Sequence, residues 1–378
     1  MRILALHDPY APIENGSVGG EDNLANLQIQ SLRELGHEVL DGRFSDSGAK
    51  RKLNQLRSQF IGTGVNTEKL IKEFKPDVIH TLNLSQRSGY AWMRTAPGPI
   101  VSSIHNFRLF CPSSIAWQSG SPCLKCRDGS ALNAILDQCA GLVGAMNASR
   151  HLIFQRDYPQ VKFPTLFLLA SENMRQIFKD VIPQEKMRIL RTPSESMALG
   201  INSGAIRRGW LFAGRLSHEK GIIDLLRIWP DEESLDIAGS GPLNEVVRSL
   251  IKDKRNIRMI GTYPPGDHAI FSKYEGMIFP STWFEGSPLV VMECLGTGTP
   301  VISGSVSSAA EQIALTKGGY VYQGKVSREK ILQAINEVRL NFDFYSANAA
   351  SNARKVASVD LWKKNLENYL LEAIDLFR

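Results

Sequence analysis

The feature of the sequence that most constrains the fold is the alternation of short apolar runs with segments of helical periodicity. The runs have the length and the β-branched content of buried strands. In chain order they are RILALH, DVIHTL, PIVSSIH, GLVGAM, TLFLLA, WLFAGRL, SLDIAG, IRMIGT, GMIFPS and PVISG. Strands that alternate with helices form parallel sheets covered by helices on both faces. The sequence therefore predicts an α/β protein with doubly wound sheets.

The apolar runs fall into two groups. The stretch between them, from Arg191 to Arg208, lacks strong periodicity and carries turn residues. A chain of 378 residues also exceeds the size at which a single core stops growing. We therefore expect two Rossmann-like domains, residues 1–195 and 196–357. An amphipathic helix in residues 358–378 is expected to pack back on the N-terminal domain.

Composition restricts the location and the partners. No apolar run approaches the roughly 18 residues of a membrane span, and the first run is followed too quickly by charge for a signal peptide. These features predict a cytoplasmic protein. The net charge of +6 favours phosphorylated ligands or an anionic membrane surface. Nucleic acid is not expected as a partner, because no helix-turn-helix, paired-histidine zinc finger or aromatic RNA-binding signature occurs.

The segment FEGSPLVVME, residues 284–293, is typical of a helix that begins at an anion site. Ser287 has the residue type of an N-cap and Pro288 that of a first helical position. The unpaired N–H groups of a first helical turn favour an anion. Glu285 and Glu293 flank this turn, so each is expected to accept hydrogen bonds from hydroxyl groups beside a phosphate. The alternative is that both are solvated acids at a helix end.

The segment GRLSHEKG, residues 214–221, follows the run WLFAGR. It places Arg215 at the end of a predicted strand and Lys220 at the start of the next helix. Ligands of open α/β sheets bind beyond the carboxyl ends of the strands. The two cations are therefore expected to face an anionic ligand. The alternative is that Lys220 and its neighbour Glu219 form an ordinary exposed ion pair.

These motifs together resemble those of the retaining glycosyltransferases of the GT-B fold, of the family-4 type (glycosyl transferases group 1). The matching segments are GGED at 19–22, HN at 105–106, GRLSHEKG at 214–221, GSGP at 239–242 and PSTWFEGSPLVVMECLGTGTPVI at 280–302. The resemblance implies a GT-B architecture, in which two doubly wound Rossmann-like domains face an interdomain cleft. It also implies metal-independent transfer of a hexose from a nucleoside diphosphate sugar to a glycan or lipid-linked acceptor, in cell-surface polysaccharide or glycolipid biosynthesis.

The resemblance assigns roles to particular residues. It implies that His105, Arg215, Lys220 and Glu285 are catalytic, with Arg215 and Lys220 on the donor diphosphate and His105 near the transferred sugar. It implies that the donor is bound by Gly19, Gly20, Gly261, Gly286, Ser287, Pro288, Leu289 and Glu293. No cofactor is implied for catalysis. Asn106 stands where the family often has Asp, so His105 lacks that orienting carboxylate, and a hydrogen-bonded histidine at a strand end is the alternative.

Two other classes of protein compete with this interpretation. A nucleotide-sugar epimerase of the same architecture would need no acceptor. A non-catalytic glycan-binding protein would have lost the paired glutamates or the Arg-Lys pair, and this chain has all four residues.

Four of the five cysteines gather in one segment. They are Cys111, Cys123, Cys126 and Cys139. The central Cys-x-x-Cys can hold one metal ion, and the outer thiolates could complete a tetrahedral structural zinc site. Reduced thiols and a redox pair are the alternatives, while a cytosolic location argues against stable disulfides. Cys294 falls in an apolar helix and is expected in the core.

Basic residues are dense between residues 50 and 75. They are Lys50, Arg51, Lys52, Arg57, Lys69, Lys72 and Lys75. Leu53, Leu56 and Phe60 recur at helical spacing within this stretch. We expect a helix that binds the inner face of the cytoplasmic membrane peripherally, through anionic lipid. An ordinary helix with a solvated basic face is the alternative.

Overall fold

The computed structural model describes residues 1–7, 20–42, 67–82, 90–127, 132–139, 159–194, 206–264 and 266–378. They form two compact units. Unit 1 comprises Met1–Ala116, Leu124–Leu190 and Lys363–Arg378, and unit 2 comprises Trp117–Cys123 and Arg191–Trp362. In this part of the chain no helix combines the length and the apolar character that crossing a membrane requires.

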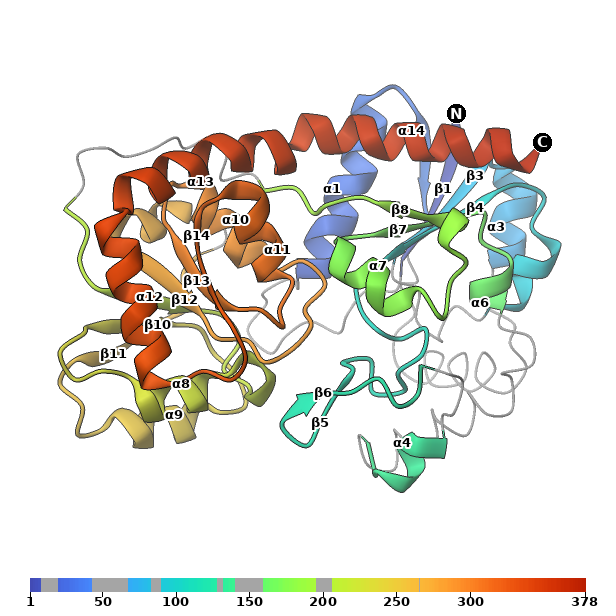
Figure 1. The fold of residues 1–378 in the computed structure, drawn as a ribbon. Coiled ribbons are helices and arrows are strands. Elements are labelled where there is room, and N and C mark those ends of the chain that lie inside the picture. The colour runs from blue at the N-terminus through green and yellow to red at the C-terminus, as the bar shows by residue number, and fades with distance from the viewer. Residues whose placement is uncertain are drawn as a thin grey trace. The chain divides into compact units, whose positions relative to one another are not determined.

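Unit 1 contains a six-stranded parallel sheet in the order β2-β1-β3-β4-β7-β8 (Figure 1). The strands are β1 (Arg2–His7), β2 (Glu38–Asp41), β3 (Val78–Leu82), β4 (Ile100–Ile104), β7 (Leu166–Leu169) and β8 (Met187–Ile189). Four predicted runs become β1, β3, β4 and β7, which confirms those predictions. The run GLVGAM lies outside the described residues.

The helices of unit 1 connect these strands. They are α1 (Gly20–Glu34), α3 (Thr67–Phe74), η1 (Ala91–Thr95), α4 (Leu132–Leu136), α6 (Pro159–Lys162), α7 (Glu172–Phe178) and η3 (Gln184–Lys186). On one face of the sheet, Ile71 of α3 and Trp92 of η1 pack against Leu4, Ile79 and Ile100. The start of α7 is fixed by Ser171, whose Oγ accepts a hydrogen bond of 3.2 Å from the backbone N of Met174.

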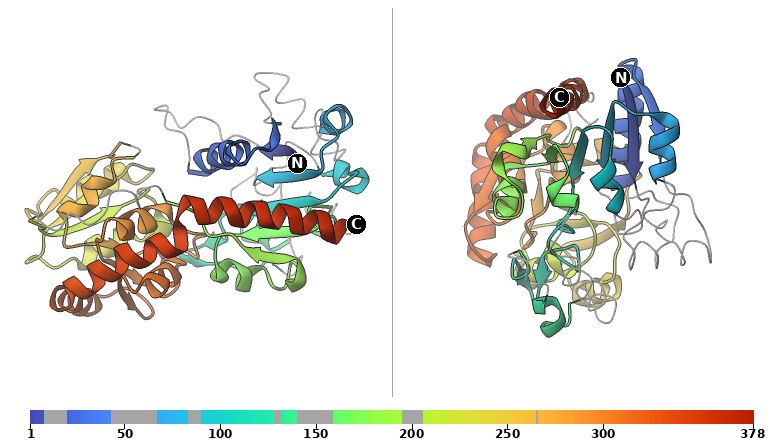
Figure 2. Two further views of the ribbon diagram at one scale, coloured as in Figure 1. Left: turned by 90° about the horizontal axis from the view of Figure 1, so that it is seen from above. Right: turned by 90° about the vertical axis from the view of Figure 1, so that its right-hand side faces the viewer.

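The last helix, α14 (Val359–Phe377), is amphipathic and long (Figure 2). Its buried side chains, Trp362, Leu366, Leu370 and Ala373, recur at helical spacing. Within unit 1, the Tyr369 hydroxyl donates to the carbonyl of Ile189 at 3.2 Å, and Glu372 pairs with Arg188 of β8. Residues from Lys363 onward are thus an integral part of unit 1.

Unit 2 contains a second six-stranded parallel sheet, in the order β11-β10-β9-β12-β13-β14. The strands are β9 (Trp210–Ala213), β10 (Leu235–Ala238), β11 (Ile257–Gly261), β12 (Gly276–Phe279), β13 (Val301–Gly304) and β14 (Gly319–Tyr322). The helices are η5 (His218–Lys220), α8 (Ile222–Ile228), α9 (Asn244–Ile251), η6 (His268–Lys273), α10 (Leu289–Gly296), α11 (Ala309–Thr316), α12 (Arg328–Leu340) and α13 (Phe342–Ala357).

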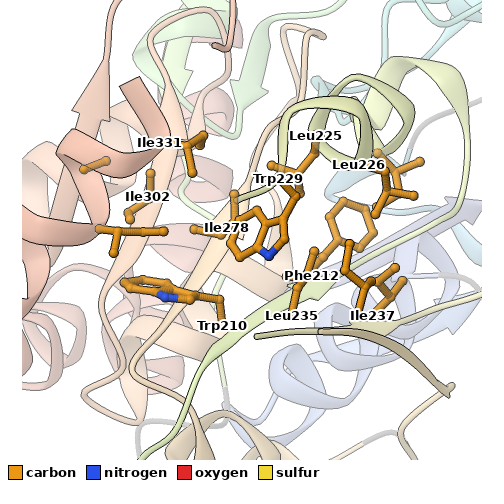
Figure 3. Packing of buried hydrophobic residues seen from close by; sticks show 14 of the residues in the cluster. Trp210, Phe212, Leu225, Leu226, Trp229, Leu235, Ile237, Ile278, Ile302 and Ile331 are labelled. Carbon is orange, nitrogen blue, oxygen red and sulfur yellow. The ribbon is translucent and has the colours of Figure 1, made fainter. Parts of the chain in front are cut away.

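The core of unit 2 follows from the alternation of side chains along these strands. Trp210 and Phe212 face one side of β9, where they pack with Leu225 of α8, Trp229 just after α8 and Ile331 of α12 (Figure 3). The intervening residues of β9 belong to a second cluster, which includes residues of α10, α11 and α13. Both faces are covered, which explains why the strands are almost continuously apolar.

Candidate functional site

The two predicted motifs of unit 2 meet at the point where the order of the strands reverses. From β9 the chain proceeds outward through β10 and β11, and it then returns to β12 on the other side of β9. Such a switch point is where open α/β sheets bind ligands. The loop after β9 carries Arg215 and Lys220, and the loop after β12 carries Glu285. Both loops leave the carboxyl ends of neighbouring strands.

Lys220 and Glu285 form an ion pair at this point, with Nζ 2.6 Å from Oε1. Their side chains are only 18% and 5% exposed. The Ser281 hydroxyl donates to the same Oε1 at 2.8 Å, and the Lys220 ammonium lies 5.1 Å from the centre of the Trp283 ring. The alternative pairing with Glu219 is wrong, because the Glu219 carboxylate accepts a hydrogen bond of 2.5 Å from Ser217.

Backbone contacts hold the two loops together. The carbonyl of Glu219 accepts hydrogen bonds from the backbone N of Thr282 at 3.0 Å and from the Ser281 hydroxyl at 3.2 Å. Gly221 has φ +71°, and a Cβ at that position would lie 2.2 Å from the carbonyl oxygen of Pro280. Only glycine permits this approach. The position of Lys220 is therefore fixed by the chain around it.

The GSGP motif extends the same arrangement to the strand ends of β10 and β11. The backbone N of Gly239 donates to the carbonyl of Gly261 at 2.8 Å, and Leu216 donates to Ser240 at 2.9 Å. A Cβ on Gly239 would lie 1.9 Å from the carbonyl oxygen of Gly214. Gly261 differs, because a Cβ there would meet no heavy atom within 4 Å. The space beside Gly261 is open.

Arg215 is exposed, and its guanidinium pairs with no described residue. It follows the carboxyl end of β9 directly, separated from Ala213 by one glycine. The site thus contains one cation held by a carboxylate, Lys220, and one cation available to a ligand, Arg215. This arrangement suits an anion with two charged groups.

The start of α10 differs from the prediction by one residue. The helix begins at Leu289, and Pro288 rather than Ser287 is the N-cap residue. The reason is a tertiary contact: the Ser287 hydroxyl accepts a hydrogen bond of 3.1 Å from Gln312 of α11. No side chain caps the helix.

Gly286 lies in the loop just before Ser287. It follows Glu285, which has a left-handed φ of 52°. Left-handed backbone in a residue other than glycine is strained and is often found at functional sites.

Glu293 lies on α10 and accepts a hydrogen bond of 3.4 Å from the Tyr263 hydroxyl. Tyr263 follows β11 and packs edge-on against Phe271, with ring centres 5.6 Å apart. Burial, together with the Glu293 carboxylate, raises the pKa of Tyr263 well above its ordinary value. Tyr263 therefore keeps its proton and acts as a donor. The sequence analysis missed this residue, since no motif marks it.

His105 lies in unit 1, directly after β4. Burial and the neighbouring His7 lower its pKa to about 4. Burial and His105 likewise lower the pKa of His80 to about 3, and His80 Nε2 lies 2.9 Å from the Ser103 hydroxyl. His80 and His105 are therefore neutral at pH 7, and His105 Nε2 has no hydrogen-bond partner among the described residues. The Asn106 side chain accepts a hydrogen bond of 3.0 Å from the backbone N of Arg108.

The four cysteines predicted to hold zinc do not gather into one ligand group in the part of the chain that the structure describes. All four clustered cysteines are described, and none of the described histidine, cysteine, aspartate and glutamate residues form a group of three or more that could hold a metal ion. Cys126 and Cys139 pack against Ala134, whereas Cys111 contacts the Ser113 hydroxyl at 3.1 Å. Proximity in sequence does not bring the four thiols together. Cys294 is buried in the core, as expected.

A short hairpin within the cysteine segment belongs to unit 2. Its strands are β5 (Trp117–Gln118) and β6 (Ser121–Pro122). The Trp117 ring stacks on His218 of the GRLSHEKG motif, with ring centres 6.5 Å apart and planes 16° from parallel. Trp117 is therefore a neighbour of the GRLSHEKG segment that no sequence motif marks.

Some predicted residues lie outside the described part of the chain, and others lie on elements of unit 1. Gly19 lies outside the described residues, and Gly20 is the first residue of α1. Of the basic stretch, residues 50–66 are not described. Lys69 and Lys72 lie on α3, and Lys75 follows it.

Comparison with known proteins agrees with this geometry. Residues 207–356 match the family model described as glycosyl transferases group 1. An uncharacterized glycosyltransferase of Methanocaldococcus jannaschii is 26% identical over 269 residues, which cover 64% of this chain and 66% of that protein.

Solved structures share the fold. Anabaena HepE in complex with UDP has a TM-score of 0.68 at 15% identity, covering 98% of this chain and 100% of its own. Sucrose-phosphate synthase from Thermosynechococcus elongatus has a TM-score of 0.71 at 14% identity, covering 98% and 99%. The match to the glycosyl transferases group 1 model thus covers residues 207–356, and the two parallel-sheet units have the GT-B fold.

Proposed function

We propose that this protein is a retaining glycosyltransferase of the family-4 type, which transfers a hexose from a nucleoside diphosphate sugar to a glycan or lipid-linked acceptor. The observation that carries the proposal is the nearly buried Lys220–Glu285 pair beside Arg215, at the strand switch point of a group 1 domain. HepE has been solved with UDP and with UDP-glucose, so a UDP-hexose is the first donor to test.

The proposed chemistry follows from charge. Cleavage of the bond between the sugar and the diphosphate develops negative charge on the leaving group. Arg215 and Lys220 stabilise that charge, together with the uncapped N–H groups at the start of α10. Because these groups are fixed before the reaction, they do not have to reorganise as the charge forms. The positive charge comes from the protein itself, so we propose that catalysis requires no metal ion.

Glu285 has a different proposed role. In the described structure its carboxylate neutralises Lys220 at 2.6 Å. A bound diphosphate would compete for the same ammonium and leave Glu285 to accept hydrogen bonds from hydroxyls of the transferred sugar. The departing phosphate would accept the proton of the attacking acceptor hydroxyl on the same face, and the product would retain the anomeric configuration.

The remaining donor contacts are assigned to unit 2. Glu293 would accept hydrogen bonds from the ribose hydroxyls, and the Tyr263 hydroxyl orients its carboxylate. The open space beside Gly261 would hold the base. The backbone from Gly286 to Leu289 would contact the distal phosphate. In unit 1 we propose that the glycine loop contacts the phosphates and that neutral His105 lies near the transferred sugar.

We further propose that the enzyme works in the cytoplasm, peripherally on the inner face of the cytoplasmic membrane, in polysaccharide or glycolipid synthesis. The support is the net charge of +6 and the basic stretch between residues 50 and 75. Anionic lipid would attract these side chains at about 1 kcal/mol each.

The test of the donor site is a thermal-shift panel of nucleoside diphosphates and their sugars. A ligand at about 100 times its dissociation constant stabilises the folded state by about 2.7 kcal/mol. We expect UDP or a UDP-hexose to raise the melting temperature, and Arg215→Gln to reduce that rise. The absence of a response to every nucleoside diphosphate would contradict the proposal.

A further inference from the structure

Unit 1 contains a cavity of about 450 Å³ that the proposed reaction does not use. It is lined by Glu68, Ile71, Lys72, Lys75, Pro76, Trp92, Thr95 and Pro97. Its walls are α3 and the turn that follows α3, together with η1 and the turn that follows η1. Pro76 precedes β3 and Pro97 precedes β4, so the cavity lies where these strands begin. His105 follows the opposite end of β4. The cavity is therefore separate from the strand ends at which a sugar would bind in unit 1.

The cavity combines an apolar wall with positive charge. Ile71, Pro76 and Trp92 are buried residues that contribute apolar surface to it. Lys72 and Lys75 are exposed at its edge, and neither pairs with a described residue. The one carboxylate in the lining is Glu68. The lining thus carries two positive charges and one negative charge.

The backbone fixes the two lysines. The α3 helix ends at Phe74, and Lys75 takes a left-handed φ of 48° before Pro76. The backbone N of Lys75 donates to the carbonyl of Ile71 at 2.9 Å. A left-handed residue followed by proline is a typical helix stop. Two acids lie close to these lysines in the sequence: Glu73 is 3.7 Å from the Nζ of Lys69, and Asp77 accepts a hydrogen bond of 2.7 Å from the backbone N of Arg2.

We propose that this cavity binds a small amphiphile that carries a phosphate monoester. The phosphate would lie between Lys72 and Lys75, and the alkyl part would lie against Trp92 and Ile71. The volume suits one small molecule, because ligand pockets are typically about 300–1,000 Å³. Two separate ammonium groups match the double negative charge of a phosphate monoester better than they match the single charge of a carboxylate. The chemistry is shared by a soluble alkyl phosphate and by the phosphate head group of a lipid.

The binding test is calorimetric titration of the whole chain with hexyl phosphate, with inorganic phosphate and hexanol as partial probes. We expect hexyl phosphate to bind more tightly than either partial probe. One charge at about 4 Å in water changes affinity about fivefold. Lys72→Gln and Lys75→Gln should therefore each raise the dissociation constant about fivefold. Glu68→Gln should lower the dissociation constant by a similar factor.

Lys69→Gln is the matched control on the same helix. Lys69 does not line the cavity, and its Nζ lies 3.7 Å from Glu73. The Lys69→Gln variant should therefore bind hexyl phosphate with unchanged affinity. All these side chains are exposed, so the variants should fold, which circular dichroism would check. An equal loss of affinity in Lys69→Gln, an unchanged affinity in the Lys72→Gln, Lys75→Gln double variant, or weaker binding in Glu68→Gln would overturn the proposal.

A second experiment distinguishes a lipid head group from a soluble phosphate ester as the occupant. Vesicles with phosphatidic acid in neutral lipid should retain the protein, and the double variant should lose this retention, if the occupant is a lipid. Binding of hexyl phosphate without lysine-dependent vesicle binding would indicate a soluble ester. Binding to neither hexyl phosphate nor the vesicles would refute the site.

Saturating UDP should not change the affinity for hexyl phosphate. A failure of this cavity to bind can therefore be told apart from a failure of the proposed donor site.

Discussion

The strand ends of the two sheets differ in how their polar groups are satisfied. In unit 2, Lys220 has a carboxylate partner at 2.6 Å, and glycines allow neighbouring loops to hydrogen-bond backbone to backbone. In unit 1, burial lowers the pKa of both His80 and His105, and each has a ring nitrogen without a described partner. The strand ends of unit 2 thus contain a paired charge, whereas His80 and His105 of unit 1 are held neutral by burial.

The largest effect should come from removing the charged group of unit 2. Lys220→Met should lower the maximal rate about 100- to 1,000-fold, because one preorganised donor to the developing charge is lost. The Michaelis constant for the donor should change less. Steady-state kinetics with a UDP-hexose would measure both quantities.

Two variants control this prediction. Lys252→Met removes an exposed lysine of the same unit and should leave the rate unchanged. Lys220→Met also leaves Glu285 unpaired in a nearly buried position, so the Lys220→Met, Glu285→Gln double variant should recover thermal stability but not rate. A normal rate in Lys220→Met would remove the contrast between the two units.

The next effect concerns the glycines of unit 2. Gly239→Ala should lower the free energy of unfolding by roughly 2–4 kcal/mol, because its Cβ would clash with Gly214 and its φ of +152° is strained for alanine. Gly261→Ala, with φ +81° and open space around its Cβ, should cost only about 1–2 kcal/mol. Urea unfolding measures both. Equal costs would mean that the close approach at Gly239 is unimportant.

A pH titration probes the histidines of unit 1. Their folded pKa values, about 4 for His105 and about 3 for His80, lie below the ordinary 6.5. The unfolded chain therefore binds more protons in this range, and stability should fall as the pH drops from 6.5 toward 4. Each histidine contributes up to about 1.4 kcal/mol per pH unit. His105→Gln should lose less stability than the parent between pH 6.5 and 4.5, measured by urea unfolding. An identical loss would show that His105 is not held neutral by the fold.

The smallest effect should come from Tyr263. Tyr263→Phe removes one long hydrogen bond to Glu293, worth about 0.5–1.5 kcal/mol. The donor Michaelis constant should rise about two- to tenfold with an unchanged maximal rate. Glu293→Gln should act in the same direction and more strongly. A change confined to the maximal rate would place Glu293 near the reacting sugar instead of the ribose.

Local sequence predicted the strands that are buried on both faces, because these are short, nearly continuous apolar runs, and it also predicted the partly exposed β11. It missed β2, β8 and β14, whose side chains are largely half-buried and whose sequences are less apolar. It also placed Arg215, Lys220 and Glu285 in segments that follow recognisable strands. That these segments are neighbours follows from the order of the strands, which only the structure gives.

The partners of these residues could not be predicted in the same way. Ser281, Tyr263 and Gln312 act on the site through contacts that depend on packing between elements. The one-residue error at α10 has this cause, because Gln312 engages the hydroxyl expected to cap the helix. The same holds for the clustered cysteines, because spacing along a loop-rich segment does not determine the distances between thiols.

The helix α14 has a consequence for synthesis. Unit 1 begins at Met1, yet its segment Lys363–Arg378 is translated only after all of unit 2. Until then, the surface that receives Leu366, Leu370 and Ala373 is uncovered on the nascent chain. Unit 2, apart from its hairpin, is continuous and can fold as soon as Trp362 leaves the ribosome. The unit that begins to be translated first is therefore the unit completed last, and a chain truncated after residue 362 would contain all of unit 2 and lack the last segment of unit 1.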